Sequence, residues 1–523
     1  MPPATKSNDL PDKTASAAVT LQTALHIGAS SVSMMVAEFR EDHTLVPIDF
    51  LEQPAPLAHD IFKNGSVSAQ TTERIVSIIK GYQRSLVELG YDGSDFTRAV
   101  ASNILAEAAN QDIVMNRIRI ACGLRINTID DGEMTRLIYL KTRRRLQDLP
   151  AMHDQNTLVV HVGPGNTRAL LFQNGRISRY TSYRLGTHRT REAIDGSHSE
   201  GPGFIRVIRE HASGNLGQLR FDYSDVEIEG LISIGYEIQS VAPSLTKSGK
   251  ACSVKTLRQV TNEAASLTDV ELVKRFQLDY QTAEALVPSL EINLAIAETL
   301  KLPDLQIPFS EYEHGLLHDL LVSQNLTGTF ADEVVRSARI LAARYQSDAS
   351  HGEHVANLCA KFFNDLADLH QMTEHDALLL QVAAILHEVG TYISPRAHHK
   401  HSEYIILNSE IFGLDRLDIT IVALVARHHR HSGPKPEHRS YAALCIDDRI
   451  RVSKLASLLR VADALERTHV QRVNQIELKR EHGKLVIRLP GLADAAVERL
   501  AMDAKADLFE QTFGLAVVIE EDS

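Results

Sequence analysis

The sequence is poor in cysteine and has no long apolar segment. Its four cysteines are widely scattered among 523 residues, without the spacing of a disulfide framework or a thiolate zinc site. The first 20 residues lack the apolar core of a signal peptide and predict a disordered tail. No apolar run approaches the length that spans a bilayer. These absences predict a reduced, cytoplasmic protein that does not contact a membrane.

The chain also lacks an excess of positive charge, with 55 lysines and arginines against 67 aspartates and glutamates. The formal net charge is −12, which argues against nucleic-acid binding, so a polyanionic ligand would need a local basic patch. The run "KTRRRLQ" (Lys141, Arg143, Arg144, Arg145) could dock such a ligand, although a run of this kind is more often the solvated face of a helix. A chain of 523 residues is too long for one core and predicts about two to four domains.

Two distant segments share one pattern, "TALHIGASSVSMMVAEF" at 23–39 and "LVVHVGPGNTRALLF" at 158–172. Each predicts a strand, a glycine-containing turn and a second strand. Glycine lets backbone N–H groups approach a phosphate closely, because it has no Cβ. The pair indicates a duplicated fold with one phosphate loop in each half. The alternative is two ordinary β-hairpins whose glycines serve only the turn.

Helices and strands alternate between and after these loops. "TTERIVSIIKGYQRSLVELG" predicts an amphipathic helix that ends at Gly90, and "INTIDDGEMTRLIYLKTRRRLQ" predicts a helix with acidic residues at its start. The alternation continues to about residue 325 and predicts an α/β architecture in two lobes.

These segments together resemble the exopolyphosphatase and guanosine pentaphosphate phosphohydrolase (Ppx/GppA) family, which has the sugar kinase, actin and Hsp70 fold. The family's D-x-G-S-N-S falls on residues 26–31 and its D-I-G-G-G-S-T-E on 161–168. Its A-T-S-A-L-R-E-A-x-N is matched by "ASNILAEAAN" at 101–110, and its S-G-x-E-E-A-R-L-I-Y by "DDGEMTRLIYL" at 130–140.

The resemblance covers nearly the whole chain after residue 20. It implies an actin-like lobe at 21–145, a second at 146–327, a homodimer, and polyphosphate or (p)ppGpp bound between the lobes with Mg²⁺ or Mn²⁺. It implies Glu133 as the catalytic base, and it places phosphate-binding residues at Gly28, Ser30, Ser31, Gly163, Gly165, Asn166, Thr167 and Arg168.

Several positions depart from the family pattern. His26 and His161 stand where the family has metal-holding aspartates, and Arg168 replaces the glutamate that closes the second loop. Ala106 replaces an arginine that grips phosphate, and Met134 replaces part of the acidic pair at Glu133. Phosphoryl transfer needs charge neutralisation and an oriented water molecule, so we expect hydrolysis at this site to be weak or lost. The added positive charge favours anion binding, unless both histidines are simply core residues.

Histidine is abundant in the second half of the chain, where twelve of the 24 histidines lie between residues 351 and 438. "SDASHGEHVANLCAKFFNDLADLH" predicts a helix with Ser350 and Glu353 as a capping box. "TEHDALLLQVAAILHEVG" predicts a buried helix that starts at Thr373 and carries His387 and Glu388 at its end.

This half resembles an HD domain, an all-α fold whose metal ligands are a His, a His-Asp pair and a distant Asp. They fall on His351, His387, Glu388 and Asp463, and His401 and His429 could complete a two-metal site. Such ligands suit Mn²⁺, Fe²⁺ or Zn²⁺ better than Mg²⁺. The alternative is a histidine-rich channel wall without metal. We place this helical domain at 328–474.

Residues 475–523 predict a small α/β appendage: a hairpin in "NQIELKREHGKLVIRLPG", an amphipathic helix and the strand "FGLAVVIEE". Three functions follow for the whole chain. The first is a family member that binds polyphosphate or (p)ppGpp with weak or lost N-terminal hydrolysis. The second is a non-catalytic sensor or scaffold for these polyanions. The third is a metal-dependent phosphohydrolase that uses only the HD-like half.

Overall fold

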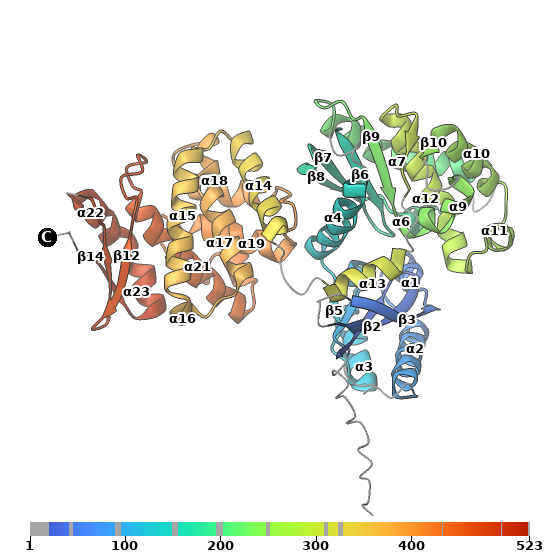
Figure 1. Ribbon diagram of the computed structural model, residues 1–523, viewed down its shortest axis with the longest axis horizontal. Coiled ribbons are helices and arrows are strands. Elements are labelled where there is room, and N and C mark those ends of the chain that lie inside the picture. Colours follow the sequence, from blue (N-terminus) through green and yellow to red (C-terminus); the bar gives the residue numbers. More distant parts are fainter. Residues whose placement is uncertain are drawn as a thin grey trace, which may run out of the picture. The chain divides into compact units, whose positions relative to one another are not determined.

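A computed structural model describes residues 20–40, 45–88, 96–148, 155–194, 202–246, 251–307, 312–322, 328–430, 432–492 and 494–520 (Figure 1). The chain divides into two compact units, one of residues 1–128 with 310–324 and one of residues 129–309 with 325–523. The expected tail before residue 20 and Gly90 lie outside the described residues. No described helix has both the length and the apolarity that crossing a membrane requires.

The first unit is built on a five-stranded sheet. Its elements are β1 (Thr20–Ile27), β2 (Ser31–Phe39), β3 (Leu45–Pro54), α1 (Leu57–Asn64), α2 (Ala69–Glu88), β4 (Arg98–Ala101), the 3-10 helix η1 (Asn103–Glu107), α3 (Gln111–Cys122), β5 (Asn127–Thr128) and α13 (Tyr312–Val322). The strand order is β3-β2-β1-β4-β5. Alternate residues of β1 and β2 pack against α2 in one apolar core, which includes Leu25, Ile27, Val32, Met34, Ile75, Ile79 and Tyr82.

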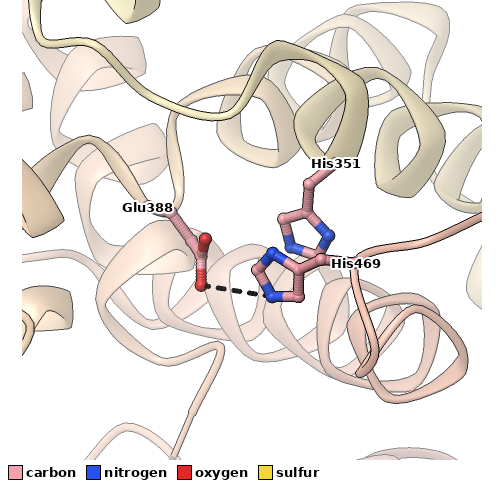
Figure 2. A group of neighbouring side chains, drawn as sticks. All are labelled: His351, Glu388 and His469. Carbon is pink, nitrogen blue, oxygen red and sulfur yellow. Dashed lines mark ion pairs between the residues drawn. The ribbon is translucent and has the colours of Figure 1, made fainter.

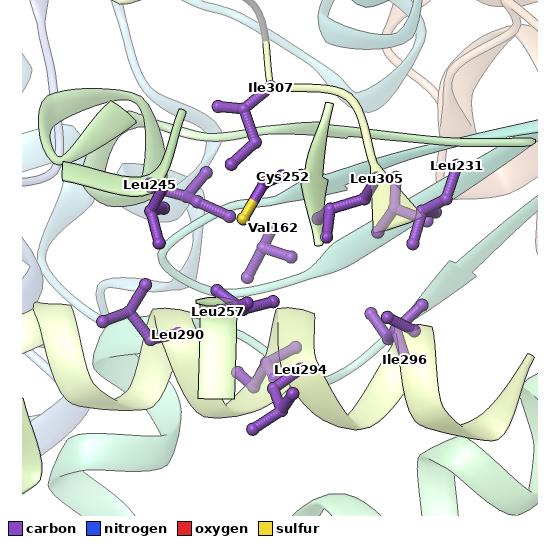
Figure 3. Close-up of a cluster of buried hydrophobic side chains, with 14 of the residues drawn as sticks. Val162, Leu231, Leu245, Cys252, Leu257, Leu290, Leu294, Ile296, Leu305 and Ile307 are labelled. Carbon is purple, nitrogen blue, oxygen red and sulfur yellow. The ribbon is translucent and has the colours of Figure 1, made fainter. Parts of the chain in front are cut away.

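The second unit begins with a four-stranded sheet and its helices. They are α4 (Asp131–Asp148), β6 (Thr157–Val162), β7 (Thr167–Gln173), β8 (Arg176–Tyr183), α6 (Thr187–Ile194), α7 (Pro202–Asp222), β9 (Gly230–Ile234), α8 (Tyr236–Ser240), α9 (Ala242–Leu245), β10 (Cys252–Ser253), α10 (Val254–Ala265), α11 (Asp269–Phe276), α12 (Tyr280–Thr299) and β11 (Asp304–Leu305). Figure 3 shows the core between this sheet and α12. Val162, the last residue before the second loop, is anchored in it.

The two sheets repeat one topology. In the first, β1 is antiparallel to β2 and parallel to β4, and β4 is parallel to β5. In the second, β6 is antiparallel to β7 and parallel to β9, and β9 forms a parallel bridge from Ile232 to Gln306. The shared strand order and directions confirm the two predicted α/β lobes of actin type.

Two helices do not lie in the unit to which the expected lobe boundaries assign them. α13 belongs to the first unit and packs on β1, β2 and β3 (Figure 1). α4 belongs to the second unit, where Tyr139 stacks on Phe172 of β7 at a centroid distance of 6.2 Å. Each helix covers the sheet face opposite its apolar core. The sequence pattern predicted the α4 helix but not which sheet it would cover.

The helical half follows in the same unit. It contains α14 (Gly328–Arg344), α15 (Ala349–Asp365), α16 (Ala367–His370), α17 (Glu374–Leu386), the 3-10 helix η2 (Val389–Tyr392), α18 (His398–Leu407), α19 (Arg416–Arg427), α20 (Arg439–Ala442) and α21 (Ile446–Leu465). α17 is central and contacts α14, α15, α19 and α21. The expected capping residue Thr373 is confirmed at α17, where it forms a capping box with Asp376. The Ser350 cap of α15 is wrong, because Asp348 accepts the hydrogen bond from the His351 N–H.

The C-terminal appendage has the predicted hairpin and final strand. It contains β12 (Glu477–Glu481), β13 (Lys484–Arg488), α22 (Ala496–Lys505), α23 (Asp507–Phe513) and β14 (Ala516–Glu520). β13 pairs antiparallel with β12 and parallel with β14. α22 and α23 both contact α21, and this brings the appendage to the helix that carries Asp463.

The start of α4 is packed tightly against the loop before α19. A Cβ on Gly132 would lie 2.9 Å from both the Gly413 O and the Asp415 N, so only glycine fits without a shift. The Asp130 and Asp415 carboxyl groups share a hydrogen bond there. Burial, followed by the charges of Asp418 and Asp130, raises the pKa of Asp415 to about 7.

This carboxyl group predicts a pH-dependent stability. A carboxyl pKa that is raised in the folded state contributes stability at low pH, and this contribution is lost as the pH rises toward about 7. We expect Asp415→Asn, which keeps a good N-cap for α19, to be more stable than wild type at pH 8 by roughly 1–3 kcal/mol. The difference should shrink toward pH 4. Urea unfolding across this pH range measures it, with exposed Asp503→Asn as the control, and identical profiles for Asp415→Asn and wild type would contradict the prediction.

Candidate functional site

The two glycine loops have the same turn geometry, each in its own unit. The Gly28 N–H donates to the Ser31 O at 2.7 Å, and the Gly163 N–H donates to the Asn166 O at 3.0 Å. Each turn joins two antiparallel strands. The strand–turn–strand predictions for both segments are therefore confirmed.

The histidines that precede these loops are interior residues. His26 is 3% exposed and His161 is 2% exposed. Each imidazole Cε1 lies close to the point where a Cβ of the loop glycine would sit, at 3.4 Å for Gly28 and 3.0 Å for Gly163. The rings thus fold over the loops at the positions where the family pattern has carboxylates.

Arg168 lies beside His161. The two residues are directly paired across β6 and β7, so their side chains share one face of the sheet, and Arg168 is also buried. The same face is covered by α4, as the 3.2 Å contact between the Thr135 and Tyr180 hydroxyl groups shows. The second loop therefore has two buried basic side chains beneath it.

Two of the loop hydroxyl groups, those of Ser31 and Thr167, already have protein partners. Ser31 Oγ donates to Glu52 at 2.6 Å, and Thr167 Oγ1 donates to the Leu185 O at 2.6 Å. Any phosphate held here would therefore rely on backbone N–H groups and basic side chains more than on these hydroxyl groups.

α6 braces the second loop with residues that the sequence analysis did not identify. The Arg189 N–H donates to the Pro164 O at 3.0 Å, and its Nε donates to the Gly165 O at 2.8 Å. Glu237 at the start of α8 accepts a 2.9 Å hydrogen bond from the hydroxyl of Thr187, and burial raises the pKa of Glu237 to about 7. No motif marked Glu237, because its place beside the loop depends on how β9 and α6 pack.

Glu133, the residue that the resemblance implies as catalytic base, is engaged by Arg136 in the next turn of α4. Arg136 Nε and Nη2 donate to the two carboxylate oxygens at 2.7 and 2.6 Å. Both carboxylate oxygens of Glu133 therefore already accept hydrogen bonds from one guanidinium group. The side chains of the basic run at 143–145 lie outside the described residues.

The helical half gathers imidazoles and carboxylates at the ends of α15, α17, α18, α19 and α21. His351 Nε2 faces His387 Nε2 at 3.2 Å, and Asp463 Oδ1 lies 3.7 and 3.9 Å from these two atoms. His398 Nε2 faces His429 Nε2 at 3.1 Å. The fold thus brings together five of the six predicted ligand positions, with His398 in addition.

Three of these imidazoles have their tautomer set by the backbone. His387 Nδ1 lies 2.6 Å from the Ala384 O, and His429 Nδ1 lies 2.6 Å from the Ala426 O. His398 Nδ1 lies 3.2 Å from the Pro395 O, which is its shorter polar contact, and 3.4 Å from Arg430 Nη1. A carbonyl oxygen only accepts, so Nδ1 is the protonated nitrogen at these carbonyl contacts, and Nε2 is the nitrogen that a metal ion would bind.

Burial keeps several of these rings neutral. It lowers the pKa of His351 to about 3, helped by His387, and holds the pKa of His429 well below its usual value. The pKa of His398 is also lowered by burial. Metal ions bind only the unprotonated ring nitrogen, so these imidazoles are prepared as ligands.

Glu388 lies between the two pairs. The Glu388 carboxylate forms one ligand set with His387 and His429. Glu388 Oε1 also lies 4.0 Å from His398 Nε2. Of the described residues, His401 joins none of these sets. The position of Ser402 explains why. The Ser402 hydroxyl donates to the His387 O at 2.7 Å, so this side of α18 faces the end of α17. His398 lies one turn before Ser402 on the same side, whereas His401 is rotated away from it by about 100° around the helix axis.

Asp463 is oriented by a lysine from the appendage. Lys505 Nζ contacts Asp463 Oδ2, and both side chains are buried. Burial would raise the pKa of Asp463, but the adjacent ammonium group of Lys505 outweighs it and holds this pKa below its usual value. The other oxygen, Oδ1, remains directed at the imidazoles. No family motif pointed to Lys505, which lies on another element.

This arrangement fits a divalent transition metal. The imidazole rings and carboxylates offer several ligand sets whose atoms lie within 4.8 Å of one another. Without a cation, the bare nitrogens of His398 and His429 would direct two lone pairs at each other across 3.1 Å. Mixed imidazole and carboxylate ligands suit Mn²⁺, Fe²⁺ or Zn²⁺.

Sequence comparison now gives the relationship of the chain. A model of the Ppx/GppA phosphatase family matches residues 36–326, and a model of Ppx/GppA phosphatase domain III matches residues 335–500. This chain belongs to the Ppx/GppA phosphatase family. The resemblance found in the sequence is therefore confirmed, and the helical half corresponds to domain III of Ppx/GppA phosphatases.

Individual Ppx/GppA relatives are distant. The guanosine-5'-triphosphate,3'-diphosphate pyrophosphatase of Vibrio parahaemolyticus is 21% identical over 90% of this chain and 92% of its own length. The protein of that name from Aeromonas hydrophila is 23% identical over the same shares. An exopolyphosphatase structure from Cytophaga hutchinsonii aligns with a TM-score of 0.50 at 13% identity, covering 58% of this chain and 98% of that one, which shows a common fold.

Proposed function

We propose that this Ppx/GppA phosphatase is a metal-dependent phosphohydrolase whose active centre lies in the helical half. The observation that carries the proposal is the pair of facing Nε2 atoms in His398 and His429, 3.1 Å apart, with their Nδ1 protons held by backbone carbonyls. His351, His387, Glu388 and Asp463 supply the remaining ligands. A divalent ion held there would lower the pKa of a bound water and polarise a phosphoryl oxygen.

The glycine loops would then serve to bind the anionic chain of polyphosphate or (p)ppGpp, with little hydrolysis of their own. Buried His161 and Arg168 replace carboxylates, and Glu133 is paired with Arg136. The two substitutions remove carboxylates that would hold Mg²⁺, while leaving positive charge near the second loop.

Phosphate release from polyphosphate and pppGpp, with Mn²⁺ or with EDTA, tests the proposal. We expect release with Mn²⁺, none with EDTA, and a loss of at least a hundredfold in His429→Ala. The substitution Glu133→Gln should leave most of the release intact. Release that survives His429→Ala but is lost in Glu133→Gln would place the chemistry at the family's own site and contradict the proposal.

A second candidate is a non-catalytic sensor or scaffold for these polyanions. The ion pair of Lys505 with Asp463 favours the sensor. The Lys505 ammonium group already supplies one positive charge beside the cluster of imidazoles and carboxylates. A protein that binds polyphosphate yet releases no phosphate at any metal concentration would support the sensor and exclude the phosphohydrolase.

Arg168 gives a separate prediction about anion binding. We expect Arg168→Glu to weaken polyphosphate binding and to flatten its salt dependence, because one cation beside the second loop is reversed. Binding measured across a salt series checks this, and Arg168→Gln should lie between the variant and wild type. Unchanged affinity in Arg168→Glu would mean that the chain is held elsewhere, such as on residues 143–145.

A further inference from the structure

His469 lies over the metal-ligand cluster, although neither resemblance includes it. Its ring is stacked flat on that of His351, with centroids 3.6 Å apart and planes 4° from parallel. Figure 2 shows it facing Glu388, whose Oε1 is 4.0 Å from His469 Nε2. Ligand atoms of His351, Glu388 and His469 lie within 4.8 Å of one another, although the stacked orientation of the two rings prevents both from binding one ion as they stand.

The loop that carries His469 is held in place by Glu466, which is fully buried. The Gln471 N–H and Nε2 both donate to Glu466 Oε1, at 2.8 and 3.0 Å, and the His469 N–H donates to the Glu466 O at 3.0 Å. The backbone angle φ is 55° at His469 and 50° at Gln471. Both values lie in the left-handed region, which is unfavourable for residues other than glycine. Backbone strain of this kind persists where the surrounding structure holds a side chain in a fixed position.

His469 stands on the solvent-facing side of the cluster. The side chains of His351 and His387 are 1% exposed and that of Asp463 is 6% exposed, whereas Glu388 is 19% and His469 33% exposed. A substrate entering from solvent would meet the His469 ring before the inner ligands.

We propose that His469 would serve as an outer ligand, on the solvent-facing side, of a metal ion held at this centre. The inference rests on the proposed function, since it presumes a metal held by the inner histidines. A ring binds a metal in its own plane, so two rings stacked at 3.6 Å cannot hold one ion together. His469 must therefore turn about its Cβ–Cγ bond to bind, which a one-third exposed ring at the end of a loop can do.

Cobalt titration of the full chain tests the inference without relying on activity. Co²⁺ bound by nitrogen and oxygen ligands absorbs visible light, and the spectrum changes when a ligand is lost. We expect His469→Gly to alter this spectrum and to weaken Co²⁺ binding about tenfold or more. Added imidazole should restore the wild-type spectrum, because removal of an exposed ring leaves a place that imidazole can reach.

The chain offers a matched control in His482, an exposed residue in the hairpin turn with a φ of 47°. His482→Gly makes the same change at a similar left-handed position outside the cluster, so it should leave the spectrum and affinity unchanged. If wild type binds Co²⁺ and His469→Gly matches it in both respects, the inference is overturned and the metal centre stands. If wild type binds no Co²⁺, the metal-dependent function fails, and this inference fails with it.

Discussion

His387→Ala is expected to abolish the rise in melting temperature that Mn²⁺ or Zn²⁺ produces in the wild-type protein. His387 Nε2 faces His351 Nε2 at 3.2 Å, and His387 belongs to two of the three ligand sets. A metal at a hundred times its dissociation constant stabilises the folded state by about 2.7 kcal/mol. This corresponds to roughly 5–10 °C for a domain of about 150–250 residues, a range that includes the helical half with its appendage.

Two variants control this experiment. Glu388→Asp should keep the shift and could enlarge it, because it restores the aspartate of the HD pattern. His401→Ala should also keep the shift, since His401 joins none of the described ligand sets. Thermal melts of metal-free protein with and without each ion supply the measurement. Identical melts of wild type with and without Mn²⁺, Fe²⁺ and Zn²⁺ would leave the histidine-rich half as a channel wall only.

The second large effect is expected at the second glycine loop. We expect His161→Asp combined with Arg168→Glu to raise Mg²⁺-dependent phosphate release at least about tenfold, because these changes return the carboxylates of the family pattern. The two positions are paired across β6 and β7. Two buried carboxylates there would repel each other, so the double variant should also become more stable when Mg²⁺ is added.

Each single substitution is the matched control for this double variant, and neither should raise the rate as far. The measurement is phosphate release from polyphosphate with and without Mg²⁺, in a His387→Ala background that silences the helical half. A wild-type protein that already hydrolyses polyphosphate through this loop at the family's normal rate would refute the idea that the loop has lost its chemistry.

Much of the fold could be predicted from local sequence patterns. The apolar–His–apolar–Gly segments predicted both hairpins, and the spacing of Ile75, Ile79 and Tyr82 predicted the buried face of α2. The Thr373 cap followed from residues within one helical turn. The Ser350 cap failed because Asp348, two residues earlier, offers an equally suitable side-chain oxygen, and only the actual start of the helix chooses between them.

The candidate metal site was predictable only in part. His351, His387, Glu388 and Asp463 could be placed from the HD pattern, and the fold brings them together. The HD pattern does not indicate whether His398 or His401 faces the cluster. This depends on how α18 is rotated about its axis, and the hydrogen bond of Ser402 sets that rotation.

The sequence by itself predicted most of the candidate ligands, through the family resemblance, and the hairpins and helices that present them, because hydrophobic period, capping and turn glycines act within a few residues. Only the tertiary structure decided that Lys505 contacts Asp463, that His469 covers His351, and that α13 packs on the first sheet. These contacts join residues far apart in the chain. Their geometry depends on how helices and sheets pack, which a one-dimensional pattern does not encode.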